Sequence, residues 1–315
     1  MVLWILVGVL AAGVLCILYG IFVEHTWYRL KRYRLDILPG TGARTLSVLH
    51  LSDLHFVNGD RRKARFLARL PSADVTVITG DLLGEAEGVE AVTEALRPAR
   101  GRLGSFFVLG SNDYYRPRPL NYFLYFTDRR DKRRLERRSR PDDLARALSE
   151  DGWVHLKNAH DDVSFDGTPV EVVGLDDPHI HRVDLRVAPR RWQDRFGLAV
   201  VHSPDPAPEL AALGYDLIVA GHTHGGQVRL PLIGALVTNS QMPRRMAMGL
   251  HRLGPAYLHV SAGLGTSKYA PFRFLCRPEA TLLELRGVPP AEAVRRRRSA
   301  DDSGTGIGSG GQQPA

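Results

Sequence analysis

The sequence is poor in cysteine: its 315 residues include only two, Cys16 and Cys276. Cys16 lies in an N-terminal apolar segment and Cys276 lies near the other end of the chain, so a disulfide between them would have to join a bilayer interior to a folded domain. A disulfide framework is therefore excluded, and a thiolate metal site cannot be formed. Any metal ion must be bound by histidine, aspartate, glutamate or asparagine.

Charged side chains are absent from residues 2–23. A helix that rises about 1.5 Å per residue spans about 33 Å over this length, and the hydrocarbon core of a bilayer is about 30 Å thick. A cleaved signal peptide is the main alternative, but no Lys or Arg precedes the run and no small-x-small cleavage site follows it. We therefore predict an uncleaved transmembrane anchor over residues 1–23.

Aromatic and basic residues follow the anchor, whereas no basic residue precedes it. Trp and Tyr favour the headgroup level of a bilayer, and Lys and Arg mark its cytoplasmic flank. The residues concerned are Trp27, Tyr28, Arg29, Lys31, Arg32, Tyr33 and Arg34. The positive-inside rule therefore predicts a single-pass protein of the cell membrane whose following domain faces the cytoplasm.

The rest of the chain divides into three parts that differ in composition and hydrophobic pattern. Residues 24–44 are predicted to be a juxtamembrane linker, and residues 288–315, rich in Pro, Gly, Ser and charge, a disordered tail. Between them, over residues 45–287, short β-rich apolar runs alternate with helix-like stretches such as Val89–Leu96 and Asp142–Leu148, which predicts an α/β domain with buried sheets. The predicted strands are Leu46–Leu51, Val75–Thr79, Phe106–Leu109, Val170–Val173, Leu198–Val201, Leu217–Ala220, Tyr257–Val260 and Leu282–Leu285.

Residue types that bind metal ions follow five of these strands. They are Asp53 and His55, then Asp81, then Asn112 and Asp113, then His202, and lastly His222 and His224. Each pair alone is typical of a turn or of a structural histidine. Together they are at the carboxyl ends of strands, where sites in α/β domains gather, and the Asp-x-His and His-x-His spacings place two side chains on one side of an extended segment. Imidazole and carboxylate ligands suit Zn, Mn and Fe. Two such ions about 3.5–4 Å apart can bind a phosphoryl oxygen and form a metal-bound hydroxide.

In this order and spacing, the motifs resemble those of the calcineurin-like metallophosphoesterase superfamily over about residues 45–286. With its N-terminal anchor and its Gly-His-Thr-His-Gly-Gly-Gln sequence, the chain is most similar to the bacterial membrane-associated branch, which includes phosphodiesterases acting on lipid-linked substrates. The resemblance implies a four-layer α/β sandwich of two mixed β-sheets flanked by helices, with two divalent metal ions at one edge. It also implies the ligands: Asp53, His55 and His224 for one metal, Asn112, His202 and His222 for the other, and Asp81 as the bridge between them.

One motif departs from the family, which reads Gly-Asn-His-Asp where this chain has Gly-Ser-Asn-Asp at residues 110–113. Without a gap, Ser111 takes the place of the ligand Asn and Asn112 that of the catalytic His; with a one-residue shift, Asn112 is the ligand and Asp113 replaces the His. Either way the imidazole is absent, at a cost of about 10²–10⁴ in rate unless another group acts. His179 and His181 are candidates to replace it, although both are equally typical of surface histidines.

Residues 114–140 form a predicted insertion with an aromatic first half and an arginine-rich second half. The net charge of the chain is +8, and much of the excess lies here. Rings at the headgroup boundary and guanidinium groups on phosphates are what an interfacial segment needs. Nucleic acid is the alternative partner, and a solvated loop needs no partner at all. The anchor favours the membrane over nucleic acid, and we expect the insertion to dock against the bilayer or to cover a lipid-like substrate.

We therefore expect a membrane-anchored two-metal phosphoesterase that hydrolyses a phosphate ester on a lipid-linked substrate. A phosphodiesterase is favoured over a protein phosphatase, and the identity of the metals stays open among Mn, Fe and Zn. The alternatives are a membrane-tethered metal-binding protein with weak or no turnover and a membrane-associated nuclease. No protein partner is implied.

Overall fold

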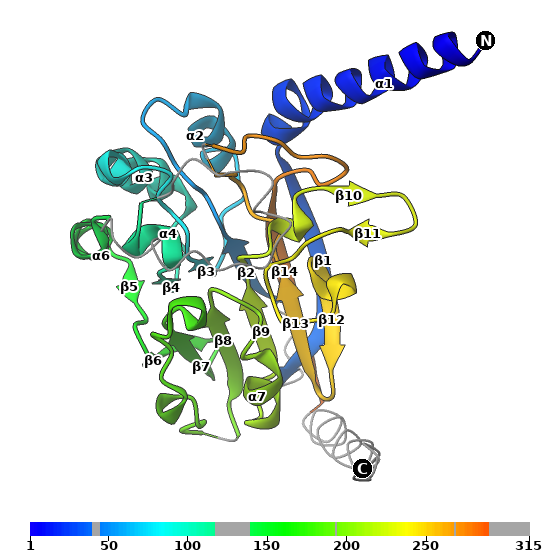
Figure 1. Cartoon of the computed structure of the whole chain (residues 1–315). Helices are drawn as coiled ribbons and strands as arrows, with labels where there is room; N and C mark the ends of the chain where they lie inside the picture. The colour runs from blue at the N-terminus through cyan, green and yellow to red at the C-terminus, as the bar shows by residue number, and fades with distance from the viewer. Residues whose placement is uncertain (40–44, 117–138, 193, 268, 290–315) are drawn as a thin grey trace, which may run out of the picture.

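Two six-stranded mixed sheets pack face to face in the computed structural model, which describes residues 1–39, 45–116, 139–192, 194–267 and 269–289 (Figure 1). The first sheet has the order β1 (Arg29–Pro39), β14 (Glu279–Val288), β2 (Thr45–Leu51), β3 (Val75–Thr79), β4 (Gly104–Val108) and β5 (Val154–His155). The second has the order β12 (Gly249–Leu253), β13 (Ala256–Val260), β9 (Leu217–Ala220), β8 (Phe196–Val201), β7 (Thr168–Leu175) and β6 (Ala159–Phe165). A small hairpin consists of β10 (Arg229–Leu230) and β11 (Gly234–Ala235).

Helices cover the outer face of each sheet, which makes four layers in all. The α-helices are α1 (Val2–Phe22), α2 (Arg61–Leu67), α3 (Val89–Leu96), α4 (Ser111–Tyr114), α6 (Pro141–Glu150) and α7 (Ala207–Ala212). Short 3-10 helices are η1 (Glu24–Thr26), η2 (Ala86–Gly88), η3 (Arg97–Ala99), η5 (Pro178–Ile180), η6 (Leu185–Val187), η7 (His224–Gly226) and η8 (Arg244–Met246). The predicted fold class, two mixed sheets flanked by helices, is confirmed.

The alternation of side chains along a strand explains why the sheets are buried on both faces. In β2, Leu46 and Val48 belong to the core between the two sheets, whereas Leu49 and Leu51 belong to the core under the helices. Strands buried on both faces read as nearly continuous apolar runs, because successive side chains point to opposite faces. This is why such runs predicted strands in the right places. The strands β2, β3 and β4 are mutually parallel, as are β8 and β9, so their carboxyl ends lie at one edge of each sheet.

The prediction of a linker over residues 24–44 is wrong for residues 29–39, which form β1. This strand pairs in parallel with β14 at the edge of the first sheet. Its inward-facing Leu35 and Leu38 are buried, while Arg29 and Lys31 contact the buried carboxylate of Glu279 at 2.8 and 3.1 Å. Charged residues are common on edge strands, since one side is open to water. In β1 the charged residues interrupt the apolar pattern that would have predicted a strand. Some of the basic residues that suggested a membrane flank are therefore part of a sheet.

Helix α1 extends away from the domain (Figure 1). Over Val2–Thr26 the helical segment is long and apolar enough to cross a membrane, judged by length and composition. The end of α1 contacts the domain closely: a Cβ on Gly20 would lie 2.6 Å from the carbonyl oxygen of Arg273. The buried carboxylate of Glu24 accepts hydrogen bonds from the backbone N–H groups of Leu275, at 2.9 Å, and Cys276, at 2.5 Å. The helix therefore leaves the domain from a fixed point.

Two other predicted segments lie largely outside the described residues. Of the predicted insertion 114–140, the part 117–138 is outside, so its docking stays a prediction. Of the predicted tail 288–315, residue 288 is the last residue of β14 and 290–315 are outside.

Candidate metal centre

The seven predicted metal ligands follow five strands of both sheets. Asp53 and His55 follow β2, Asp81 follows β3, Asn112 follows β4, His202 follows β8, and His222 and His224 follow β9. Five of them have a positive φ, namely Asp53 (47°), His55 (41°), Asp81 (52°), His222 (69°) and His224 (50°). A left-handed backbone at a residue other than glycine costs about 1–3 kcal/mol and persists where the surrounding structure enforces it, typically at functional sites. The chain turns sharply at these ligands, and the turns aim the side chains at a common point.

Glycine is required where two of the strand ends approach each other. Gly80 precedes Asp81 and has φ 86°. A Cβ at this position would lie 2.6 Å from the backbone nitrogen of Gly110 and 2.8 Å from Nδ1 of His202. Any larger residue would push the ends of β3, β4 and β8 apart, so the Gly-Asp sequence is needed for the convergence.

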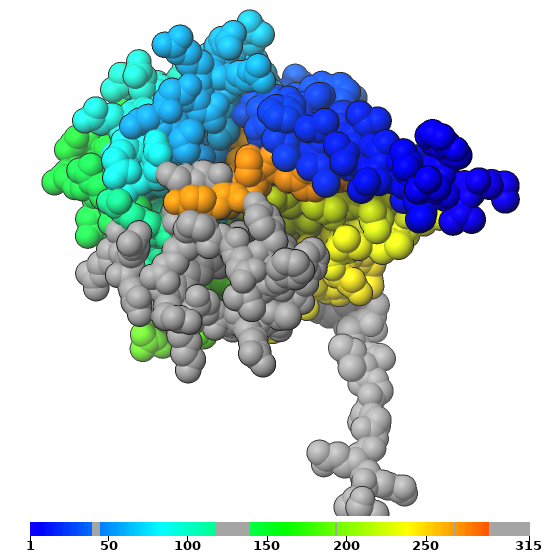
Figure 2. All heavy atoms as spheres, turned by 45° about the horizontal axis from the view of Figure 1, so that its top comes forward, coloured from blue at the N-terminus to red at the C-terminus, as the bar shows by residue number. Residues whose placement is uncertain are grey.

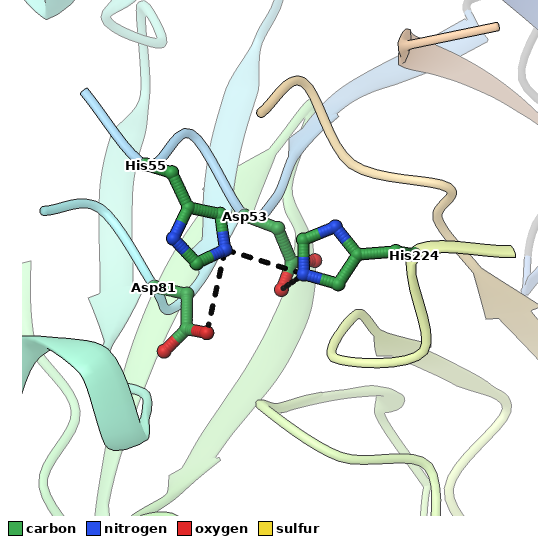
Figure 3. A group of neighbouring side chains, drawn as sticks. All are labelled: Asp53, His55, Asp81 and His224. Carbon is green, nitrogen blue, oxygen red and sulfur yellow. Dashed lines mark hydrogen bonds and ion pairs between the residues drawn. The ribbon is translucent and has the colours of Figure 1, made fainter. Parts of the chain in front are cut away.

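Four of these side chains, Asp53, His55, Asp81 and His224, offer ligand atoms within 4.8 Å of one another (Figure 3). His55 Nε2 lies 3.2 Å from His224 Nε2 and 3.6 Å from Asp81 Oδ2, and His224 Nε2 lies 3.6 Å from Asp53 Oδ1. Two nitrogen ligands at about 2.0–2.1 Å from one ion, at tetrahedral or octahedral angles, are about 2.8–3.4 Å apart. The spacing of the imidazoles therefore fits a single cation between them.

A second group lies on the other side of Asp81. His202 Nε2 is 3.6 Å from Asp81 Oδ1, and His222 Nδ1 is 3.2 Å from His202 Nε2. The backbone N–H of Asn112 donates to Asp81 Oδ1 at 2.8 Å, and its side-chain amide donates to Asp81 Oδ2 at 2.5 Å. Asp81 Oδ2 thus lies near His55 and Asp81 Oδ1 near His202, while Asn112 contacts both oxygens.

Hydrogen bonds on the outer side of three imidazoles fix which nitrogen faces the centre. Nδ1–H of His202 donates to the carbonyl oxygen of Thr79 at 2.7 Å, and Nδ1–H of His224 donates to that of Gly265 at 3.2 Å. Nε2–H of His222 donates to the carbonyl oxygen of Asn239 at 3.2 Å. In the neutral form of each ring, the inner nitrogen therefore carries a lone pair. An outer N–H on a carbonyl and an inner lone pair are the usual arrangement of metal-binding histidines, so the donor set fits a metal ion.

Burial and neighbouring charges set the protonation of the centre. Burial lowers the pKa of His55 to about 4 and the pKa values of His222 and His224 well below 6.5, so these rings are neutral at pH 7. Burial acts the same way on His202, but the carboxylates of Asp81 and two further aspartates outweigh it and raise its pKa to about 9. Burial raises the pKa of Asp53 to about 7. A bound cation would take the place of the proton on His202, since ligands bind in their deprotonated form.

A family model described as calcineurin-like phosphoesterase matches residues 46–226, which include all seven of these residues. The chain belongs to the calcineurin-like phosphoesterase family. It is accordingly a metal-dependent phosphoric ester hydrolase, and the members of this family generally bind two divalent metal ions.

Several curated proteins are similar to this family member over most of their length. An uncharacterized metallophosphoesterase of Bacillus subtilis, YkoQ, is 27% identical, with 82% of this chain and 90% of the relative covered. The phosphodiesterase YaeI of Escherichia coli is 27% identical, with 85% and 92% covered. The UDP-2,3-diacylglucosamine pyrophosphatase LpxG of Chlamydia trachomatis is 26% identical, with 88% and 95% covered.

The other predicted catalytic residues of this phosphoesterase lie in different surroundings. Asp113 is buried, and its two oxygens accept hydrogen bonds at 2.9 Å from the backbone N–H groups of Leu83 and Gly110. This carboxylate holds the loop in place and does not replace an imidazole. The ring of His179 packs on that of His222, with centroids 4.5 Å apart. His181 is exposed, and within the described part of the chain no hydrogen bond or ring contact joins its side chain to a ligand.

Sequence analysis missed a buried chain of hydrogen bonds that ends on Asp53. His259 Nδ1 lies 2.9 Å from His50 Nδ1, His50 Nε2 lies 2.9 Å from Thr79 Oγ1, and Thr79 Oγ1 donates to Ser52 Oγ at 2.7 Å. Ser52 in turn donates to Asp53. Because the Thr79 hydroxyl donates to Ser52, His50 donates to Thr79 and must accept from His259. Both histidines sit inside predicted strands, where nothing in the sequence distinguishes them from other inward-facing residues.

Sequence analysis also missed Arg273, which is fully buried behind His224. Its Nη2 donates to the carbonyl oxygens of Ala262 and Gly265, each at 2.7 Å, and the Gly265 oxygen also accepts from His224. The thiol of Cys276 donates to the carbonyl oxygen of His224 at 3.2 Å. Arg273 and Cys276 therefore support the backbone and the ring of this histidine. The Gly-x-Gly at residues 263–265, three residues after the end of a strand, was a sign of a tight loop here.

Proposed function

We propose that this chain is a membrane-anchored phosphodiesterase that uses two divalent metal ions, Mn, Fe or Zn, to hydrolyse a lipid-linked phosphate ester. The observation that carries the proposal is the position of Asp81. Its Oδ2 is 3.6 Å from His55 and its Oδ1 is 3.6 Å from His202, so one carboxylate can bridge two cations. Bound there, the two cations would supply the nucleophile and stabilise the charge on the phosphoryl oxygens.

Each cation has its own set of side chains in this proposal. Asp53, His55 and His224 hold one, and Asn112, His202 and His222 hold the other. The backbone N–H and the side-chain Nδ2 of Asn112 both donate to Asp81, which leaves the side-chain oxygen of Asn112 as a ligand for a cation. This favours the shifted reading of the Gly-Ser-Asn-Asp motif for the ligand, with Asn112 as the ligand and no imidazole after it.

We assign His179 as the general acid that protonates the departing oxygen. Its ring packs on the metal-facing His222, from a loop that follows β7 of the second sheet, so it lies beside the centre without being one of its ligands. A general acid that protonates the leaving oxygen contributes about 10²–10⁴ in rate. Through His179 the second sheet would supply the imidazole that the motif at residues 110–113 lacks.

Three observations support the proposed membrane anchoring and the lipid-linked substrate. The apolar α1 is long enough to span a bilayer. The relatives named a phosphodiesterase and a UDP-2,3-diacylglucosamine pyrophosphatase act, by their names, on phosphate diesters or diphosphates, in one case on an acylated compound. Basic residues, among them Arg29 and Lys31, follow α1, which favours a catalytic domain in the cytoplasm.

The test uses the full chain in detergent, because β1 and Glu24 tie the N-terminal region to the domain. The protein is stripped of metal, reloaded with Mn, Fe or Zn, and assayed on bis(p-nitrophenyl) phosphate and on the monoester. His222→Ala is the test variant, and His251→Ala, a histidine of β12 that bonds Met248, is the matched control.

We expect diester cleavage that depends on metal, is lost in His222→Ala and is kept in His251→Ala. Two metals bound per chain without turnover of either ester would favour the metal-binding protein. Cleavage of single-stranded nucleic acid in preference to simple diesters would favour the nuclease. Failure to bind any metal would refute the proposal.

A further inference from the structure

The tip of the β10–β11 hairpin is an apolar turn that projects into solvent. Leu232 is fully exposed and Ile233 is 66% exposed. Leu232 also has φ 66°, in the left-handed region where Gly or Asn is the usual residue, and the N–H of Ile233 donates to the carbonyl oxygen of Pro231 at 2.8 Å. A strained, exposed leucine beside an exposed isoleucine adds nothing to the core, and both side chains are open to contact from outside the chain.

The base of this hairpin is joined to the end of the anchor helix. The N–H of Arg229 donates to the carbonyl oxygen of Phe274 at 2.9 Å, and the N–H of Phe274 donates to that of Gln227 at 3.0 Å. The ring of Phe274 packs edge-on against Tyr19 of α1, with centroids 6.5 Å apart. The neighbouring residues 275 and 276 are the ones held by Glu24. One short segment therefore connects the hairpin to α1.

The hairpin and α1 project from the same side of the domain. Figure 1 shows β10 and β11 extending below α1, and the tilted view of Figure 2 again shows the yellow-green region beside the dark blue helix. Two apolar side chains near this junction are exposed as well: Trp27, which follows η1, and Leu275, which follows Phe274, are each 50% exposed. Arg277 covers the Trp27 ring at 3.8 Å from its centroid. Tryptophan and arginine in contact are typical of the headgroup level of a bilayer.

We propose that the hairpin tip, residues 231–233, inserts into the same bilayer that α1 crosses, which rests on the proposed membrane anchoring. Lipid is the occupant that the surface favours, because the apolar tip projects from the same side of the domain as the exposed apolar side chains of α1 (Figure 1). Basic side chains flank the hairpin as well. Arg244 donates to the carbonyl oxygen of Leu236 at 3.2 Å, just after β11, and Arg245 next to it is exposed. Guanidinium groups at this level can pair with anionic lipid headgroups.

Insertion of the tip would place the metal centre at the membrane surface. β10 begins shortly after His224, and Nη1 of Arg229 donates to the carbonyl oxygen of Gly225 at 2.9 Å. The loop that carries His224 is therefore fixed at both ends, by the hairpin and by the segment that holds α1. The substrate class that fits this position is a phosphate ester carried on a lipid in the adjacent leaflet, delivered without leaving the bilayer.

The test places a fluorescent label at the tip of the full chain in lipid bilayers. Cys16→Ser removes the exposed native thiol, and the remaining Cys276 is buried. Leu232→Cys is labelled with an environment-sensitive dye in vesicles of phosphatidylcholine and phosphatidylglycerol, with or without nitroxide on the acyl chains. Leu103→Cys is the matched control, because Leu103 is a leucine of 45% exposure that precedes β4, at the opposite end of that strand from Asn112.

We expect the label at residue 232 to shift to the blue and to be quenched at least several-fold more strongly than the label at 103. Equal, water-like emission at both positions would overturn the proposal. A blue shift without nitroxide quenching that grows with protein concentration would overturn it too, in favour of a second copy of the chain as the occupant.

A second measurement separates this inference from the proposed function. The double variant Leu232→Ser, Ile233→Ser should cleave soluble bis(p-nitrophenyl) phosphate like the parent, but cleave p-nitrophenyl hexadecyl phosphate in vesicles at least several-fold more slowly. Equal rates of parent and variant on the vesicle substrate would refute the role of the tip in substrate access. If neither ester is cleaved by the parent, the proposed function fails, while the quenching result still decides whether the tip is in lipid.

Discussion

Replacement of His259 by leucine should lower the stability of the protein at neutral pH and remove part of its sensitivity to acid. His259 and His50 face each other between the two sheets, both fully buried, at the start of the hydrogen-bond chain that leads to Asp53. Burial lowers the pKa of His259 to about 3 and that of His50 well below 6.5. Both are therefore neutral in the folded protein over a pH range in which they are charged in the unfolded chain.

The sign and size of the pH effect follow from this difference. Below about pH 6.5 each histidine takes up a proton in the unfolded chain but not in the folded protein. The free energy of unfolding is therefore undiminished by these two groups above pH 6.5, and it falls as the pH falls toward 3. In this range, one such histidine lowers the free energy of unfolding by about 1.4 kcal/mol for each pH unit. Between pH 6.5 and 5, His259 alone should therefore account for a loss of about 2 kcal/mol.

At neutral pH the leucine variant loses the donor to His50. A buried acceptor left without a partner costs about 1–3 kcal/mol, so the variant should be less stable by this amount at pH 7.5. Residue 259 cannot take up a proton in the variant. The difference in free energy of unfolding between the parent and the variant should therefore shrink by about 2 kcal/mol at pH 5. The two proteins should then be nearly equal in stability, or the variant should be the more stable.

Urea unfolding of the metal-free full chain in detergent, followed by tryptophan fluorescence at several pH values, measures both quantities. His251→Leu on the neighbouring β12 is the matched control, because that ring is partly exposed. A stability difference between the parent and His259→Leu that stays constant from pH 7.5 to 5 would refute the reasoning. The control should show no such narrowing of the difference.

Three further predictions concern groups around the centre. Arg273→Met removes the guanidinium N–H groups that the buried carbonyl oxygens of Ala262 and Cys276 accept from, and it should lower the free energy of unfolding by about 3–5 kcal/mol in urea titrations, with Arg273→Lys less affected. His179→Ala should reduce kcat for the diester by about 10²-fold or more, whereas the exposed His181→Ala should keep it; equal effects would contradict the assignment. A chain that starts at residue 36 lacks most of β1 and should aggregate on gel filtration, whereas one that starts at residue 23 keeps the strand and Glu24 and should stay folded with native circular dichroism.

The fold was largely predictable because most of its strands are buried on both faces. The eight predicted runs all coincide with strands, except that Leu109 lies one residue beyond β4, and Val75–Thr79 and Leu217–Ala220 have the predicted bounds. The edge strands β1, β6 and β12 escaped prediction because water covers one side of each, so their sequences mix charged and apolar residues. In β1 this mixture resembled a membrane flank.

The residues of the candidate site that follow strands could be predicted from the sequence. The residues that reach the site through packing between distant segments could not. The structure brings the seven predicted ligands to one edge because parallel strands end together. Arg273 and His259 could not be identified in this way, since each approaches the centre only through contacts between segments far apart in the sequence. Asp113 shows the opposite error: its place beside the ligand Asn112 suggested chemistry, but both of its oxygens bind backbone N–H groups.

The central claim is that Asp81 bridges two metal ions, and electron paramagnetic resonance of the Mn-loaded full chain tests it most directly. Because Oδ2 of Asp81 lies near His55 and Oδ1 lies near His202, we expect two Mn ions per chain with an exchange-coupled spectrum, and loss of the coupling in Asp81→Ala. A spectrum of isolated Mn ions at full loading, or a single Mn per chain in the unaltered protein, would contradict it.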